Sequence, residues 1–447
     1  MKKIKDYFLF LVIFLVTPGL LQGQFKKIEF TEYTMDNGLH VILHQDNSSP
    51  VVAMNITYHV GSKNEDPERT GFAHFFEHLM FEGSENIGRG EYFKYVQNAG
   101  GQNNAGTSFD YTTYYEVLPS NQLALGLWLE SERLLHLKID SIGVETQRSV
   151  VKEERKMRFE NQPYGSFMEE MFSHAFDVHP YRWVPIGSVQ YIDQAKLEEF
   201  IEFYSHYYVP NNAVLVIAGD IEIEETKKLV HDYFAGIPRG NHQIIRPDVK
   251  EPERKSEVVD TVFDNIQLPA TIMGYQMPAR THEDYHALDM LQKLLSGGES
   301  SRLYKELVDN QQLAVAVQAV PFTLEDAGLF IILGIASLGK DIMEVQNAIE
   351  KEIDEVKESL IDEREFQKLV NSIENDVISS HSTMEGISYA MAQYHTMFDD
   401  ASMINKELER YMKVTREDIK RVANEYLNQD KRVTLYYLPM SQKPEAQ

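Results

Sequence analysis

Cysteine is absent from the 447 residues. Disulfide bonds, thiolate catalysis, Cys-based zinc sites and a lipid-modified N-terminal Cys are therefore excluded. Any zinc ion would have to be bound by His and carboxylate side chains. Basic residues are also scarce, because 43 Lys and Arg are outnumbered by 69 Asp and Glu, which gives a net charge of −26. A nucleic-acid partner needs a Lys/Arg surface that binds phosphate, so none is expected.

Long apolar runs are missing except near the start of the chain. Three lysines among the first five residues precede the apolar run 8–16, and Gly23 is a plausible small residue at a cleavage point. This pattern predicts a signal peptide over 1–23. An uncleaved membrane anchor is the alternative, but the run is well short of the ~20 residues that span a bilayer. We expect a bacterial periplasmic or secreted protein with no integral membrane segment after cleavage.

The composition is that of a globular protein, with 43% apolar and 11% aromatic residues. The length favours two or more domains of ~200 residues. A stretch with two prolines, many charges and few large apolar residues follows residue 246 and is typical of a linker. The sequence predicts an N-terminal domain over 25–246, a linker over 247–254 and a C-terminal domain over 255–440.

Hydrophobic patterning suggests that the two halves are related. In the first half it predicts strands at 38–44, 51–58 and 212–219, and helices at 71–83, 90–98, 121–137, 144–160 and 224–234. In the second half it predicts strands at 257–264, 270–276 and 432–437, a strand pair over 314–336, and helices at 282–296, 340–358, 362–377 and 415–427. Residues 73–83 align with 287–297, which suggests a duplication. Leu288, Leu291 and Gln292 then occupy the positions of three polar residues in the first half, so only one repeat could bind a metal.

Those three polar residues are His74, Glu77 and His78, in the segment HFFEH. Two histidines four residues apart leave one face of a helix together, as two ligands of a tetrahedral zinc ion do. Glu77 can lie beside the metal without ligating it and can act as a general base. This is the inverted HxxEH order of zinc peptidases. The flanking residues are apolar, so the polar groups would be buried and would need partners, which a metal supplies.

Two further questions concern the metal site. Glu153 and Glu154 lie in a later helical pattern and could each provide a third ligand, and the spacing does not choose between them. The segment His282–His286 is a literal HExxH motif. Its flanks are polar and Thr281 could cap a helix there, so we expect an exposed helix start and not a metal site.

These motifs resemble the pitrilysin/insulinase (M16) family of zinc peptidases, which includes the mitochondrial processing peptidase. The similar segments extend over 28–440 and are 71–84, 100–108, 147–154, 179–181, 208–213, 218–220 and 301–304. The resemblance implies an α+β fold of two homologous α/β domains. Each domain would have a mainly antiparallel sheet with flanking helices, and the two would face each other across a cavity.

The resemblance also implies roles for single residues. Glu154 becomes the third ligand of one Zn2+ per chain, and Glu77 becomes the catalytic base. Asn104 and Ala105 mark an exposed edge strand to which a peptide adds as a further strand. Arg302 becomes a substrate-binding residue. The implied activity is that of a zinc metalloendopeptidase that hydrolyses peptides or unfolded segments.

Two positions depart from the family pattern. Gln147 stands where the family has a helper glutamate, so zinc affinity or water activation would be weaker. Val315 stands where active members have a tyrosine, and Val cannot donate a hydrogen bond to a developing oxyanion. We therefore expect a homologous partner subunit, in a heterodimer or a homodimer, to supply an Arg/Tyr pair. The alternatives are a non-catalytic or weakly active subunit of such a complex, and a zinc hydrolase that acts on something other than peptides.

Overall fold

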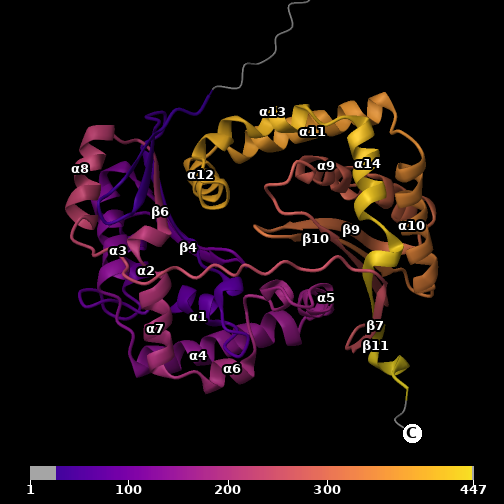
Figure 1. Ribbon diagram of the computed structural model, residues 1–447, viewed down its shortest axis with the longest axis horizontal. Helices are drawn as coiled ribbons and strands as arrows, with labels where there is room; N and C mark the ends of the chain where they lie inside the picture. Colours follow the sequence, from indigo (N-terminus) through magenta and orange to yellow (C-terminus); the bar gives the residue numbers. More distant parts are fainter. Residues whose placement is uncertain (1–26, 445–447) are drawn as a thin grey trace, which may run out of the picture.

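The computed structural model describes residues 27–444, which form two β-sheets with flanking helices (Figure 1). The predicted signal peptide lies outside the described residues. The first sheet has six strands in the order β1-β2-β6-β3-β5-β4, and the second has five in the order β7-β11-β8-β10-β9. The strands are β1 Thr31–Thr34, β2 His40–Gln45, β3 Val51–Tyr58, β4 Gln102–Thr107, β5 Thr112–Pro119, β6 Ala213–Gly219, β7 Val258–Asp264, β8 Ala270–Met277, β9 Ala314–Thr323, β10 Gly328–Ala336 and β11 Arg432–Pro439.

The two sheets repeat one topology. The order β2-β6-β3-β5-β4 in the first sheet corresponds strand for strand to β7-β11-β8-β10-β9 in the second. In both sheets the first of these pairs is parallel and the other pairs are antiparallel. Strand β1 is an addition at one edge of the first sheet. The predicted fold of two homologous α/β domains with mainly antiparallel sheets is confirmed.

Strand composition follows position in the sheet. The central strand β6, with the sequence AVLVIAG, is buried at every residue. The edge strand β4, with the sequence QNNAGT, is polar and has no fully buried residue. Apolar residues on both faces suit a strand that is covered on both sides, whereas polar residues suit an open edge. Strands β4 and β9 are the equivalent open edges of the two sheets.

Several helices of each half pack on the sheet of their own half, and one helix of each half packs on the sheet of the other half. The helices are α1 Phe72–Leu79, α2 Tyr92–Asn98, α3 Leu123–Leu135, α4 Ser141–Arg155, α5 Phe167–Ala175, α6 Val189–Gln194, α7 Leu197–Tyr207, α8 Ile223–Phe234, α9 Tyr285–Ser296, α10 Ile342–Glu358, α11 Glu363–Ser380, α12 Met384–Phe398, α13 Glu407–Met412 and α14 Arg416–Tyr426. Helices α5, α6, α7, α12 and α13 were not predicted from the sequence. Of these, α5 and α12 hold the equivalent place in the two halves, as the third helix after β5 and after β10.

Helices α5 and α12 are exchanged between the halves. Helix α12 packs on β3 and β6 of the first sheet, and α5 packs on β8 and β11 of the second (Figure 1). Under α12, Met391 and Ile387 join Ile42 and Val216 in one apolar cluster. Under α5, Met171 lies over Gly274, where a Cβ atom would collide with its sulfur. Each sheet therefore buries one face against a helix of the opposite half.

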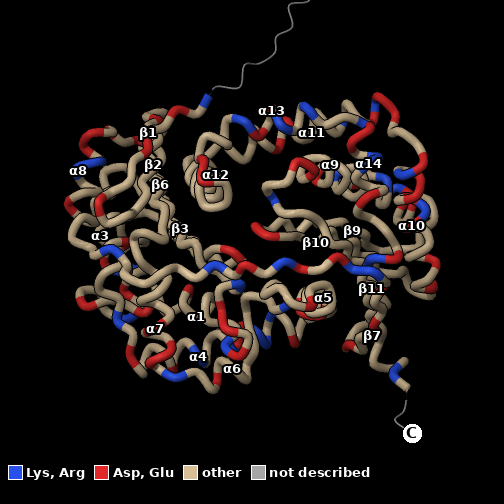
Figure 2. The backbone as a smooth tube through the Cα atoms, in the orientation of Figure 1, with Lys and Arg blue, Asp and Glu red and all other residues tan. Residues whose placement is uncertain are grey.

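Residues 238–257 form a coil that connects the halves and is bound along its length. The backbone N–H groups of Asp177 and His179 donate to the Glu251 carboxylate, each at 2.8 Å. Figure 2 shows acidic and basic residues close together along this coil. The domain boundaries at 246 and 255 stay predictions. No helix of residues 27–444 is long and apolar enough to cross a membrane.

Candidate metal centre and active site

Helix α1 is fixed at its start by a buried carboxylate. Gly71 has φ of 100°, which glycine adopts without strain, and α1 begins at the next residue. Glu65 accepts hydrogen bonds from the N–H groups of Gly71 and Ala73, at 2.9 and 2.8 Å. Burial raises the pKa of Glu65 to about 8, although these backbone hydrogen bonds oppose the rise. An acceptor at this point satisfies N–H groups that a helix start leaves without partners.

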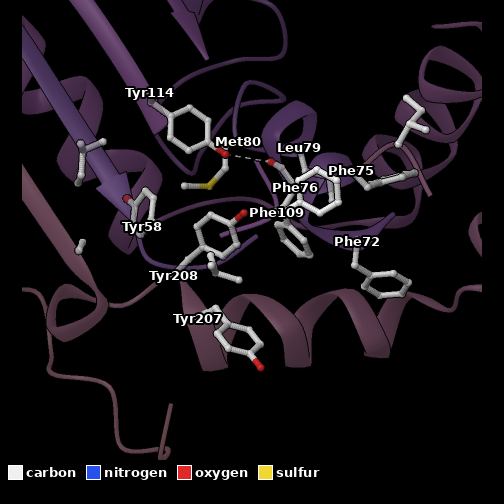
Figure 3. Packing of buried hydrophobic residues seen from close by; sticks show 14 of the residues in the cluster. Tyr58, Phe72, Phe75, Phe76, Leu79, Met80, Phe109, Tyr114, Tyr207 and Tyr208 are labelled. Atoms are coloured by element: carbon white, nitrogen blue, oxygen red, sulfur yellow. Dashed lines mark hydrogen bonds between the residues drawn. The ribbon is translucent and has the colours of Figure 1, made fainter. Parts of the chain in front are cut away.

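Aromatic packing sets the orientation of α1. Phe72, Phe75 and Phe76 are almost fully buried, and all three rings lie near the ring of Phe200 on α7. The Tyr114 hydroxyl donates to the Phe76 carbonyl at 3.4 Å (Figure 3). With this face in the core, the histidines of α1 lie on the side of the helix that meets α4.

His74, His78 and Glu154 form one cluster between α1 and α4. The Nε2 atoms of His74 and His78 lie 3.5 and 3.1 Å from Glu154 Oε2. Donor atoms around a tetrahedral zinc ion, with bonds of about 2.1 Å, lie about 3.4 Å apart. The three side chains could together hold a metal ion. Glu153, the alternative left open by the spacing, is exposed.

The charge states in the cluster suit a metal. Burial, and next the neighbouring His78, lower the pKa of His74 to about 4, so its imidazole is neutral at pH 7. The hydrogen bond with His78 is the largest influence on Glu154 and holds the pKa of this carboxyl below its usual value. Neutral imidazoles and an ionised carboxylate are the forms that bind metal ions. The donor set therefore fits Zn2+. The negative charge of the Glu154 carboxylate is partly balanced by Arg158, whose guanidinium lies 3.1 Å from it.

Glu77 lies between this cluster and the edge strand β4. Its Oε2 atom accepts a hydrogen bond of 2.7 Å from the Thr107 hydroxyl. Burial raises the pKa of Glu77, and this hydrogen bond lowers it. The sequence did not single out Thr107, because its role depends on how β4 passes α1. A carboxylate held in this way can accept and return a proton.

The expected peptide-binding residues lie on the open edge of the first sheet. Asn104 and Ala105 pair with Tyr115 and Tyr114 of β5, and β4 has no strand on its other side among residues 27–444. The Asn104 side chain accepts a hydrogen bond from the Ala105 N–H at 2.9 Å. A pocket of about 290 Å³ lies beside this edge and is lined by Ala105, Thr107, Tyr115 and Tyr389 among others. An added strand would have to displace the Asn104 amide.

Arg302 is not brought to the metal cluster. Its guanidinium donates two hydrogen bonds to Glu365 of α11, at 3.0 and 2.6 Å. Val315 lies at the start of β9 and is about half exposed. Gln147 also points elsewhere, because its amide donates to Glu82 at 2.5 Å. Gln147 is therefore engaged with Glu82, and the Val315 side chain has no polar atom with which to bind a substrate.

The structure corrects part of the expectation for the HExxH segment His282–His286. Helix α9 begins at Tyr285 with Asp284 as its N-cap residue, so Thr281 does not cap it. His282 lies before the helix, whereas His286 is buried, 3.3 Å from Glu407. The expected exposed helix start is therefore wrong for His286, because α13 covers it. Among residues 27–444, the possible metal-binding groups do not include this motif.

The duplicated fold and the His2Glu cluster define a class, the two-domain zinc peptidases. The family described as Insulinase (Peptidase family M16) matches residues 40–181, and Peptidase M16 inactive domain matches residues 194–373. The chain is 31% identical to zinc protease PqqE of Helicobacter pylori over 433 residues, which cover 96% of this chain and 97% of the relative. The protein therefore belongs to the M16 family of zinc peptidases.

Other relatives agree with this assignment. The crystal structure of a protease from Helicobacter pylori has a TM-score of 0.89 and 30% identity, and it matches over 92% of this chain and all of that one. A zinc protease of Streptomyces coelicolor is 24% identical over 92% of this chain and 90% of its own. The periplasmic protease PqqL from Escherichia coli shares the fold, with a TM-score of 0.76 and 16% identity, over 92% of this chain and 47% of that one.

Proposed function

We propose that the protein is a zinc-dependent endopeptidase that hydrolyses peptides or unfolded segments. His74, His78 and Glu154 bind one zinc ion per chain, and Glu77 is the general base. The observation that carries the proposal is the approach of both imidazole Nε2 atoms to one Glu154 oxygen. Glu77 directly precedes His78 on helix α1. Membership of a zinc peptidase family supports it.

The chain's own residues perform the proton transfers. A bound zinc ion would supply a water of lowered pKa and would polarise the peptide carbonyl. Glu77 accepts the proton that the attacking water loses and returns it to the leaving amine. Thr107 holds the Glu77 carboxylate through its hydroxyl, so the proton acceptor stays at a fixed place beside β4.

The open edge beside Glu77 favours peptides over other substrates. An extended peptide can add to β4 through backbone hydrogen bonds at Asn104 and Ala105. Side chains of an added strand alternate between the two faces of the sheet, so some point toward α1 and the others away from it. This placement brings a backbone carbonyl near Glu77, whereas a compact non-peptide substrate would leave the edge unused.

Neighbouring carboxylates on α4 provide a matched test. Glu154→Gln should lower the zinc content by one ion per chain and abolish the peptidase activity, because the amide is a poorer ligand. Glu153→Gln should change neither, because Glu153 is exposed. Zinc is measured by mass spectrometry of the dialysed protein, and cleavage is measured on a peptide library. Equal zinc content in the two variants would contradict the ligand assignment.

We also propose that a homologous partner subunit completes the site. Arg302 is engaged by Glu365 on its own chain, and the Val315 side chain carries no hydrogen-bond donor. A second copy of this chain would bring Val315 again, so a heterodimer suits the chemistry better than a homodimer. A single purified chain that cleaves peptides at full rate would exclude this partner role. A zinc-loaded chain with no activity under any pairing would favour a non-catalytic subunit.

The N-terminal segment bears on where in or outside the cell the protein acts. We propose export to the periplasm or the exterior, directed by residues 1–23. The E. coli neighbour is a periplasmic protease, which supports this location. Detecting the shortened chain in a periplasmic or culture fraction tests it.

A further inference from the structure

A second group of metal-binding side chains lies far from the proposed peptidase site. Glu32 on β1, His40 on β2 and His395 on α12 each offer a donor atom, and these atoms lie within 4.8 Å of one another. We propose that these residues form a second site, for a divalent transition ion such as Zn2+, which clamps α12 onto the first sheet. The site shares no residue with the proposed catalytic centre.

Strand register brings the three residues together. Strands β1 and β2 pair with Glu32 opposite Ile42 and Thr34 opposite His40. Alternation along a strand places Glu32, His40 and Ile42 on one face of the sheet. Ile42 packs in the apolar cluster that contains α12 residues, so this is the face that α12 covers. His395 lies in the last turn of α12, above the outer strands.

The contacts of His40 with Glu32 and Thr34 suit a metal ligand. His40 Nε2 lies 3.3 Å from Glu32 Oε2, and its Nδ1 atom lies 3.1 Å from the Thr34 hydroxyl. This second contact fixes the ring and leaves Nε2 directed toward the carboxylate, as partners of metal-binding histidines do. The rings of His40 and His395 stack, with centroids 3.9 Å apart and planes 3° apart.

Ligand type and access favour a metal between the two rings. Two imidazoles with one carboxylate suit Zn2+, Cu2+ and Ni2+ better than Mg2+ or Ca2+. Glu32 is exposed and both histidines are partly exposed, so an ion can enter from solvent. The stacked rings have to tilt so that their nitrogen lone pairs converge.

Such an ion would act on the contact between the halves. Strands β1 and β2 belong to the first half and α12 to the second, so the three ligands join segments more than 350 residues apart in sequence. A ligand that binds only this arrangement stabilises it. The ion would therefore hold α12 in place over the first sheet, and its removal would loosen that contact.

Zinc counting tests the proposal on the mature chain. The wild-type protein should bind one zinc ion more per chain than His395→Ala, whether or not the catalytic cluster is filled. A double variant His74→Ala/His78→Ala should retain the second ion. The exposed His231→Ala on α8 is the control and should match the wild type. Equal zinc content in wild type and His395→Ala would overturn the proposal.

A conservative variant guards against misfolding of His395→Ala. Glu32→Gln keeps the shape of an exposed side chain, and it should weaken zinc binding in the double-variant background at least about tenfold. Zinc should also raise the melting temperature of that background and slow amide hydrogen exchange over 384–398. Unchanged affinity in Glu32→Gln, or zinc that leaves exchange in α12 unaltered, would show that the clamp does not exist.

Discussion

The Thr107 hydroxyl donates a 2.7 Å hydrogen bond to Glu77 Oε2 and so joins the edge strand β4 to helix α1. The same two elements carry the expected peptide-binding edge and the two histidines of the metal cluster. One contact therefore fixes the proposed proton acceptor relative to the place where a peptide would lie.

Removing that contact should slow catalysis without changing zinc content. Thr107→Val keeps the side-chain shape but leaves the Glu77 carboxylate without its donor. A hydrogen bond to a charged group contributes about 1.5–3 kcal/mol, so kcat/KM should fall about tenfold to a hundredfold. Thr107→Ser retains the hydroxyl and is the control, with activity close to wild type. If Thr107→Val is as active as wild type, the contact has no catalytic role.

The junction between the halves should make stability depend on acid pH. Buried Lys63 lies 3.1 Å from Asp110, 2.6 Å from Glu325 and 3.0 Å from Asp326. Burial raises the pKa of Asp326, but the interactions with His179 and Lys63 outweigh it and bring the pKa down to about 2.

The sign of this effect follows from proton binding. Between about pH 4 and pH 2 the unfolded chain binds more protons at Asp326 than the folded chain does, so the contribution of Asp326 is present above that window and is lost as the pH falls through it. Urea unfolding at several pH values should show a shallower loss of stability in Asp326→Asn than in wild type. Parallel curves for the two proteins would refute this.

The exchanged helices should make the halves depend on each other. Without α12, a chain of residues 25–246 would expose Ile42, Val214 and Val216 on the uncovered face of its sheet. Exposed apolar patches of this kind promote association. We expect the isolated segment to aggregate or to lack cooperative unfolding, whereas the full chain unfolds in one transition. Calorimetry and analytical ultracentrifugation check this, and a monomeric, cooperatively folded segment would argue against it.

Local pattern is enough to predict part of the site. The i, i+4 spacing of His74 and His78 on an apolar helix, with Glu77 between them, predicts a metal-binding segment, and the structure brings both histidines to Glu154. The choice between Glu153 and Glu154 needs either the family resemblance or the crossing of α1 and α4. Which of two adjacent helical residues faces another helix is set by tertiary packing.

Long-range features could not be predicted in the same way. Helix α12 mixes polar and apolar residues and contains Gly386 and Ser388. Its buried residues pack on the first sheet, which lies about 170 residues or more before it in the sequence. Lys63 and Glu325 are 262 residues apart in sequence. Helix α13 buries His286, which the polar flanks of its motif had suggested would be exposed. Each of these depends on the pairing of the halves, which hydrophobic periodicity does not report.

The most direct test of the central claim is to measure zinc content and peptide hydrolysis together in Glu77→Gln. The substitution leaves His74, His78 and Glu154 intact but removes the proton acceptor. We expect zinc content equal to wild type and a fall in kcat of about a hundredfold or more, with any required partner present at saturation. Hydrolysis at the wild-type rate would contradict the role of Glu77, and loss of zinc would contradict the assignment of the three ligands.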